Sequence, residues 1–283
     1  MTNSNTNSSS RKSTRRRSTR RSKNSKNPFR RLPAFLVWAL LALVVVIYCI
    51  VFYRNFVTPY SFRWKALYGT TVYPDGKVRG IDISHYQDNI DWDKLRNALI
   101  HDTPIRFMFV KATEGTDIID ENFNLNFYQA RKCELIRGAY HFFSTKSSAA
   151  KQARLFCKIV QLEDDDLPPV LDVETIGDLT PAQLQHETLL WLSIVERHYG
   201  VTPILYTSYK FKTSYLNTPA FDKYPYWIAH YYVNELEYKG KWAFWQHTDA
   251  GHIDGINGYV DVDLFNGDYK ELMKMTVGAQ KSK

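Results

Sequence analysis

Eight short runs of β-forming residues recur along the chain from Val78 onward, and helical patterns separate several of them. Strands and helices in alternation are typical of a parallel sheet covered by helices, and about eight repeats favour a closed barrel over a sandwich. The segment is short for such a barrel, so we expect an irregular (β/α) barrel of the α/β class that lacks some later helices. The runs are VRGIDISHY, IRFMFVKATEG, IRGAYHFF, LPPVLDVET, TPILYTS, YPYWIAHY, WAFWQHT and GYVDVDLF.

The best-defined helical pattern is TPAQLQHETLLWLSIVERHYG. Thr180 can cap its first turn, Pro181 suits the first helical position, and Gly200 follows the last turn. We expect three further helices, at Trp92 to Ile100, Glu121 to Cys133 and Ser148 to Gln161.

The carboxyl ends of the strands in a parallel barrel meet at one mouth, where active sites form. Acidic and aromatic residues stand at these ends, so carboxylates from three strands converge on a mouth rimmed with tyrosine and tryptophan. Such a mouth suits a sugar, because aromatic rings pack on the apolar faces of pyranoses and carboxylates supply acid, base and charge stabilisation. The strand-end residues are Asp82, Lys111, Glu114, Tyr140, His141, Asp172, Glu174, Tyr206, Trp227, His230, Trp245, Gln246, Asp261 and Asp263.

The fourth run, PPVLDVET, places Asp172 and Glu174 two positions apart. Residues i and i+2 of a strand point to the same face, so both acids enter one space. Two like charges that close do not ionise independently, and one carboxyl tends to hold its proton near neutral pH, as an acid catalyst requires. The plain alternative is a strand-end pair that faces water.

A basic tail and an uncharged apolar stretch precede the barrel pattern. Residues 1–31 are mostly Ser, Thr, Asn and Arg, a composition that predicts disorder. The stretch 32–53 carries no charge and is long enough to cross a bilayer, and it lacks the cleavage site of a signal peptide. We expect a disordered tail (1–31), a transmembrane signal anchor (32–53), a linker (54–77), the barrel domain (78–270) and a C-terminal tail (271–283).

Charge bias predicts the orientation of the span. Eleven Lys or Arg residues lie between Arg11 and Arg31, and no acidic residue precedes Asp75. The amino terminus should therefore stay in the cytoplasm and the barrel should be exported, to the periplasm or the cell-wall side. Nucleic-acid binding by the arginine run is the alternative, but no aromatic stacking residues interrupt the run, so we expect the bilayer as partner and no nucleic acid.

The cysteines leave one question open. Cys49 lies in the apolar stretch, and export would allow Cys133 and Cys157 to form a disulfide, although two thiols on neighbouring helices explain the pattern equally well. No Cys/His spacing indicates a metal site, and no glycine-rich phosphate loop is present.

Eight motifs in register resemble the family 25 glycoside hydrolases, the lysozymes of the Chalaropsis type. The resemblance covers roughly Val78 to Asn266 and excludes the tail and the span. The resemblance implies an irregular barrel that needs no metal or other cofactor. It also implies cleavage of the β-1,4 bond between N-acetylmuramic acid and N-acetylglucosamine in peptidoglycan. The motifs are GIDISHYQ, FVKATEG, GAYHFF, LDVE, ILYT, YWIAHY, FWQ and GYVDVDLF.

The resemblance assigns candidate catalytic residues motif by motif: Asp82, Asp172, Glu174 and Asp261. Many members carry Asn where this chain has Asp263, so we expect one extra carboxylate near the rim. The aromatic residues could instead fill the barrel, and Lys111 and Glu114 could form an ion pair that supports the rim. The candidate substrate-binding residues are Tyr140, Tyr206, Trp227, Trp245, Gln246, Lys111, Glu114 and Asp263.

The two acids of the fourth run can be given separate roles. Glu174 reaches further than Asp172 and, beside that second acid, should have a raised pKa, so we expect it to act as general acid and then base. Asp172 either attacks the anomeric carbon or orients the substrate's own 2-acetamido group for attack. Two residues on one strand face approach the sugar from the same side, which favours the second route. Asp82 and Asp261 would steady developing positive charge and bind hydroxyls.

Membrane-anchored muramidase is therefore the leading hypothesis. The alternatives are a non-catalytic glycan-binding module on the same barrel and a related hydrolase with a different glycan, which product masses would distinguish.

Overall fold

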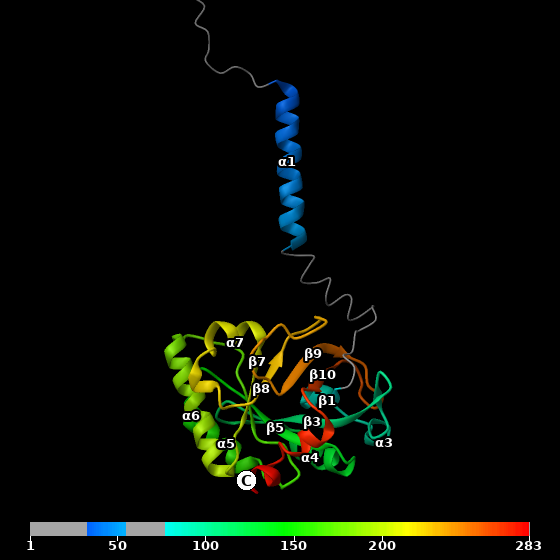
Figure 1. The fold of residues 1–283 in the computed structure, drawn as a ribbon, viewed down its shortest axis with the longest axis vertical. Helices are drawn as coiled ribbons and strands as arrows, with labels where there is room; N and C mark the ends of the chain where they lie inside the picture. Colours follow the sequence, from blue (N-terminus) through cyan, green and yellow to red (C-terminus); the bar gives the residue numbers. More distant parts are fainter. Residues whose placement is uncertain (1–32, 55–76, 283) are drawn as a thin grey trace, which may run out of the picture. The chain divides into compact units, whose positions relative to one another are not determined.

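The structure, a computed structural model, describes residues 33–54 and 77–282 (Figure 1). Two units make up the chain, Met1–Asn55 and Phe56–Lys283. The expected basic tail (1–31) and nearly all of the expected linker (54–77) lie outside the described residues.

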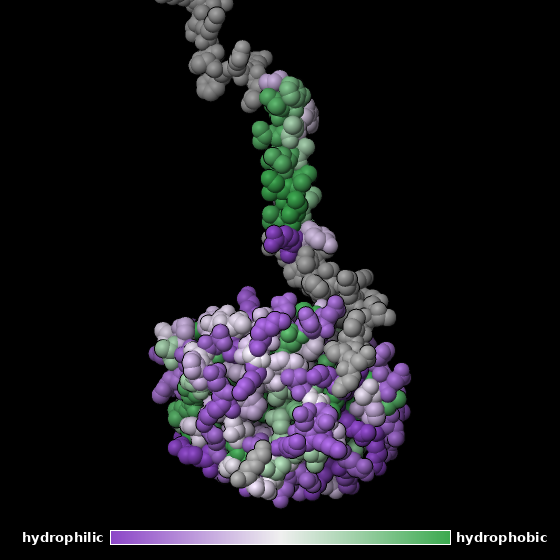
Figure 2. All heavy atoms as spheres, viewed as in Figure 1, coloured by the Kyte–Doolittle hydropathy of each residue, from purple (hydrophilic) through white to green (hydrophobic). Residues whose placement is uncertain are grey.

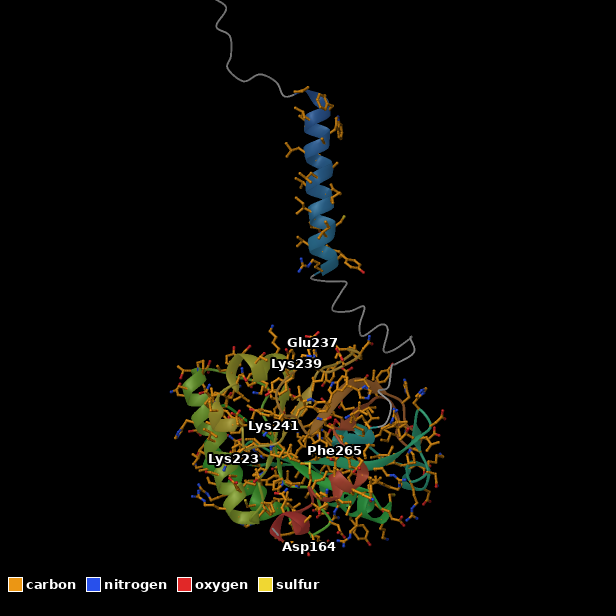
Figure 3. All side chains as sticks on the ribbon, in the orientation of Figure 1. Asp164, Lys223, Glu237, Lys239, Lys241 and Phe265 are labelled. Carbon is orange, nitrogen blue, oxygen red and sulfur yellow. The ribbon has the colours of Figure 1, made fainter. Side chains whose placement is uncertain are left out.

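The first unit contains one long helix, α1 (Ala34–Phe52). Its 19 residues have a mean hydropathy of 3.0 over the most apolar window, and none of them is buried. Side chains project from α1 to all sides (Figure 3), and they are apolar along its length (Figure 2). At 1.5 Å per residue the helix is about 28 Å long, which matches a hydrocarbon core of about 30 Å. By length and composition, α1 can cross a membrane.

The second unit is built on a closed barrel of eight strands. The ring closes because β1 pairs with β10 on one side and with β3 on the other. In order around the ring the strands are β1 (Val78–Ile83), β3 (Thr103–Glu114), β5 (Ile136–Phe142), β6 (Val170–Asp172), β7 (Ile204–Ser208), β8 (Tyr226–Ala229), β9 (Phe244–Gly251) and β10 (Val260–Phe265). The expected α/β barrel is confirmed.

The last strand departs from the expected all-parallel arrangement. β10 runs antiparallel to both of its neighbours, β9 and β1, whereas the other neighbouring pairs are parallel. A parallel neighbour needs a crossover connection, and the short loop between β9 and β10 contains no helix. As a result the start of β10, not its end, lies at the mouth formed by the carboxyl ends of the other strands.

Aromatic rings fill the barrel interior. Phe109 stacks on Trp227 with ring centroids 4.3 Å apart and meets Phe244 edge to face at 5.1 Å. Two interior glycines make room for the rings: a Cβ on Gly80 or Gly138 would lie 2.4 Å from Phe107 or 2.6 Å from Phe109, respectively. The lower part of the barrel is thus a packed aromatic core.

Helices cover the outside of the barrel (Figure 1). The longest, α6 (Pro181–Tyr199), has the predicted ends, because the Thr180 side chain accepts from Gln183 N and Gly200 adopts φ 71°. The others are α3 (Trp92–Leu95), α4 (Phe123–Lys132), α5 (Ala149–Ile159), α7 (Tyr209–Tyr215), α8 (Tyr269–Met273) and α9 (Val277–Lys281), with short 3-10 turns η2 (His85–Gln87) and η3 (Pro219–Phe221).

The helix expected over Trp92 to Ile100 is shorter than predicted. It ends at Leu95, and β2 (Leu99–Ile100) then forms a hairpin with the start of β3. His101 and Asp102, the two turn residues, adopt φ 47° and 62°, the positive values that a tight hairpin turn requires. A second small hairpin pairs β4 (Ile118–Ile119) with the end of β3.

Residues assigned above to a C-terminal tail (271–283) form α9 and part of α8. Leu272 and Val277 are buried, and Gly278 N donates to Asp164 O over 2.8 Å, at the site labelled in Figure 3. The ordered domain therefore extends beyond residue 270, to the end of the described residues.

Candidate active site

One polar pocket opens at the mouth of the barrel, with a cavity volume of about 220 Å³. Its walls come from all eight barrel strands and from the turn after β1. The residues that line it are Asp82, Ile83, Ser84, Tyr86, Gln87, Lys111, Tyr140, Phe142, Asp172, Glu174, Tyr206, Trp227, Tyr231, Gln246 and Asp261. All four candidate catalytic carboxyls therefore share one space.

Strand register explains how distant residues meet there. Asp172 on β6 stands beside Tyr206 on β7, which in turn stands beside Trp227 on β8. Because the ladders are parallel, these residues lie at the same height and face the same way. Asp261 joins them from the opposite chain direction, since it stands opposite Asp82 in the antiparallel β1–β10 ladder.

Asp172 and Glu174 occupy different depths of the pocket. Asp172 ends β6 and is 6% exposed, and its Oδ1 has no hydrogen-bond partner among the described residues. Glu174, two residues beyond the strand, is exposed at the mouth. The pair thus presents a buried, incompletely bonded carboxyl beneath one that reaches solvent.

Burial raises the pKa of both acids, but not equally. The pKa of Asp172 lies well above its usual value because the side chain is desolvated and because the charges of Glu174 and Asp82 are close. Desolvation also raises the pKa of Glu174, while the adjacent Tyr206 hydroxyl and the charge of Lys111 oppose the rise. The sequence argument expected the raised pKa at Glu174, whereas burial raises that of Asp172 further.

A hydrogen-bond network through Gln246 holds the Asp82 side chain in place. The hydroxyls of Tyr206 and Tyr231 both donate to Gln246 Oε1, each over 2.7 Å. The amide nitrogen of Gln246 must therefore face away from them, and it donates to Asp82 Oδ2 over 2.6 Å. Gln246 lines the pocket, but its polar atoms are engaged with protein side chains.

Asp261 completes the acidic lining. Burial and the neighbouring charge of Asp82 raise the pKa of Asp261 to about 9. A cluster of acids with raised pKa values in a pocket is typical of an acid–base site.

Among the described residues that line the pocket, Lys111 is the one cation, and it forms an ion pair with Glu114. Its Nζ donates to Glu114 Oε2 over 2.7 Å and lies 5.1 Å from the centre of the Phe142 ring. Glu114 does not line the pocket. The two residues form the rim ion pair considered from the sequence.

Besides Glu114, two further candidate substrate-binding residues do not line the pocket. The Trp245 indole packs in the outer core, and its Nε1 donates to His230 O over 2.8 Å. Asp263 is fully buried below the pocket floor, where Trp227 Nε1 donates to its Oδ1 over 2.8 Å. The sequence placed Asp263 near the rim, but it lies one interior position deeper along β10 than Asp261.

Several residues that line the pocket were not predicted from the sequence. Tyr231 has the same parity as Trp227, so extending the strand alternation past Ala229 would have placed it inward. Tyr86 and Gln87 lie in the turn after β1, where strand periodicity gives no guidance. That turn is held by a capping box, in which Ser84 N donates to Gln87 Oε1 over 2.9 Å.

The two histidines of the early motifs are structural. His141 is buried outside the barrel between Thr113 and Gln152, at 2.7 and 2.9 Å, and burial lowers its pKa to about 4. His85 bonds to Asp120 over 2.8 Å. Neither lines the pocket.

Residues 33–54 and 77–282 contain neither a disulfide nor a cluster of metal-binding side chains. Cys133 and Cys157 are free thiols, and the described residues contain no cluster of three or more metal-binding side chains.

Comparison with known proteins identifies similar chains. The sequence profile described as glycosyl hydrolases family 25 matches residues 81–256, a range that includes Asp82, Asp172 and Glu174 and ends before β10. The chain is 37% identical over 230 residues to the uncharacterized protein YegX of Escherichia coli O6:H1, covering 81% of this chain and 84% of YegX.

Two lysozymes are also similar. Lysozyme M1 of Streptomyces globisporus is 30% identical over 217 residues, which cover 70% of this chain and 71% of that protein. The bacterial lysozyme from Streptomyces coelicolor superposes with a TM-score of 0.67 at 28% identity, covering 73% of this chain and 100% of the solved chain.

Proposed function

Because the chain belongs to family 25 of the glycosyl hydrolases and is a peptidoglycan-cleaving hydrolase of the lysozyme type, we propose that it is a membrane-anchored N-acetylmuramidase. It would cleave the β-1,4 bond between N-acetylmuramic acid and N-acetylglucosamine. Two relatives, from Arthroderma benhamiae and Chalaropsis, are N,O-diacetylmuramidases, which supports this choice of bond. The observation that carries the proposal is the convergence of four carboxyls in one aromatic-lined pocket.

Glu174 is our general acid and base. It is the carboxyl at the mouth, where it can reach a glycosidic oxygen, and desolvation raises its pKa toward the range that acid catalysis needs. It would protonate the leaving oxygen and later remove a proton from the attacking water.

Asp172 would assist the substrate's 2-acetamido group. The acetamido carbonyl oxygen attacks the anomeric carbon, and Asp172 accepts a hydrogen bond from the acetamido N–H. The unpartnered Oδ1 supports this role, since a buried carboxyl oxygen without a donor is costly until a ligand supplies one. An N–H donor also favours the ionised form of Asp172, so substrate binding would shift the proton of the pair toward Glu174.

Asp82 and Asp261 lie across the pocket from this pair by strand order. Asp82 would steady the positive charge that develops on the sugar ring, and Asp261, which keeps its proton at neutral pH, would bind hydroxyls. Direct attack by Asp172 is the competing mechanism. It predicts a covalent glycosyl-enzyme intermediate on Asp172, which mass spectrometry of rapidly quenched reactions would detect and which the substrate-assisted route excludes.

The anchor is the second part of the proposal. We propose that residues 1–31 form a disordered cytoplasmic tail, 32–53 a signal anchor, 54–77 a linker and 78 onward an exported domain. The apolar α1 and the eleven Lys and Arg residues before it support this topology. Replacing Leu41 and Val45 by Arg should release the protein from membranes on alkaline extraction, and continued retention would contradict the anchor.

Product analysis tests the cleaved bond. Purified peptidoglycan is digested with the full-length protein in detergent micelles, and the products are reduced with borohydride before mass measurement. Fragments that end in muramitol support a muramidase. Fragments that end in glucosaminitol would show a different bond specificity, and no fragments from the folded protein would favour a binding module.

A further inference from the structure

Asp263 is a buried acid that the proposed chemistry does not use. It is 0% exposed, and one carboxyl oxygen, Oδ1, accepts from Trp227 Nε1 over 2.8 Å. The other oxygen, Oδ2, has no N–H or O–H donor among the described residues. An ionised carboxylate with one unsatisfied oxygen in a fully buried site would be costly, so a neighbouring group must interact with that oxygen.

The neighbour that can do so is Asp82. On β1 the residue opposite Asp263 is Gly80, which has no side chain, and the next interior position on that strand is Asp82. Asp82 and Asp263 are therefore diagonal neighbours on the inner face of the β1–β10 ladder, and each carboxyl affects the pKa of the other. Two ionised carboxylates have only acceptors, so they can bond only when one of them carries a proton.

Among the described residues, the charged groups that act on Asp263 are other acids. The titratable groups that face it are Asp82 on β1 and Asp261 on its own strand. The side chains that reach it from β8 and β9, Trp227 and Gln246, carry no charge. Burial raises the pKa of both acids well above the usual value, and the charge of Asp263 adds to the rise at Asp82 as the charge of Asp261 does at Asp263.

We propose that Asp263 is a positioning residue that shares one proton with Asp82 beneath the pocket. The shared proton links the two carboxyls, while Gln246 bonds Asp82 from the other side. Asp82 is thereby held between two fixed partners, and the pair carries one negative charge instead of two. The positioning of Asp82 for catalysis rests on the proposed function, but the shared proton does not.

Asp263→Asn is the matched variant. An asparagine has the same shape, can still accept from Trp227 with its oxygen, and donates to Asp82 with an amide group that does not titrate near neutral pH. Asp263→Leu keeps a similar volume and removes the donor. If Asp263 positions Asp82, the Asn variant should keep most of the wild-type kcat, and the Leu variant should lose kcat with little change in KM.

The deciding measurement needs no substrate. Unfolding equilibria of the full-length wild type and the Asn variant are measured by chemical denaturation in detergent micelles across a pH series. Above about pH 4 the unfolded wild type releases a proton that the folded pair keeps, so its folding constant should fall relative to that of the variant by about tenfold per pH unit.

Parallel stability curves for the two proteins would overturn the shared proton, whatever the activity on peptidoglycan. A tenfold relative slope combined with absence of all hydrolysis would instead retain the proton pair and count against the proposed function. Equal kcat values for wild type and the Leu variant would overturn the positioning role.

Discussion

Asp82 on β1 stands directly opposite Asp261 on β10, although 178 residues lie between them in the sequence. The antiparallel direction of β10 creates this pairing, because it brings the start of the last strand to the end of the first. At this position the charge of Asp82 raises the pKa of Asp261. The irregular strand is therefore what places the fourth acid in the pocket.

Asp82→Asn should lower the pKa of Asp261 from its value of about 9, since the charge of Asp82 is the largest cause of the rise after burial. An NMR titration of the Asp261 carboxyl carbon in wild type and variant measures the change. An unaltered or raised pKa would show that the two groups do not interact across the ladder.

Asp172→Asn should stabilise the fold at neutral pH while impairing hydrolysis. The folded-state pKa of Asp172 is raised, so the folded protein binds a proton that the unfolded chain has released above about pH 4. That difference lowers wild-type stability as pH rises through this window, and asparagine removes it. Thermal unfolding should show a higher Tm for the variant at pH 7 than for wild type and no such gain near pH 3. A gain of the same size at both pH values would exclude proton linkage as the cause.

Tyr86→Ala should weaken binding of long glycan fragments. Tyr86 lines the pocket yet is 77% exposed, and the turn that carries it is held by the Ser84–Gln87 capping box. A lost aromatic contact of about 0.5–1.5 kcal/mol raises KM by about 2- to 12-fold with little change in kcat. Tyr269→Ala is the control, because Tyr269 is also exposed but lies on α8, outside the pocket lining. Equal effects of both changes would contradict a sugar-binding role for Tyr86.

Trp245→Phe should reduce stability without affecting KM. The Trp245 indole packs in the outer core and donates to His230 O, so its loss costs about 0.5–1.5 kcal/mol of unfolding free energy. Denaturation and steady-state kinetics on the same preparation separate the two effects. A raised KM with unchanged stability would restore the sugar-contacting role expected from the sequence.

The sequence predicted the residues of the site better than their depth. Strand-end position identified Asp82, Asp172 and Tyr206 correctly as lining residues, because periodicity and the closure of a barrel determine which way they face. It could not reveal that Trp245 faces outward while its neighbour Gln246 faces inward, since that depends on the register between β9 and β10, which shifts near this point.

The direction of β10 and the depth of Asp263 were also beyond local sequence patterns. The sequence pattern of a strand is the same whether its neighbour is parallel or antiparallel. The connection between the strands and their packing determine the direction. The end of the helix at Leu95 was missed for a related reason: the hairpin that follows depends on two positive-φ residues, His101 and Asp102, that are not glycine.

Glu174→Gln tests the central claim most directly. Hydrolysis of purified peptidoglycan is followed with full-length wild type, this variant and Glu134→Gln, which alters a glutamate whose side chain is 86% exposed after α4. Glutamine keeps the size of Glu174 but cannot transfer the proton, so the rate should fall by about 10²- to 10⁴-fold while Glu134→Gln matches wild type. Unchanged hydrolysis by a folded Glu174→Gln protein would contradict the assignment of the general acid.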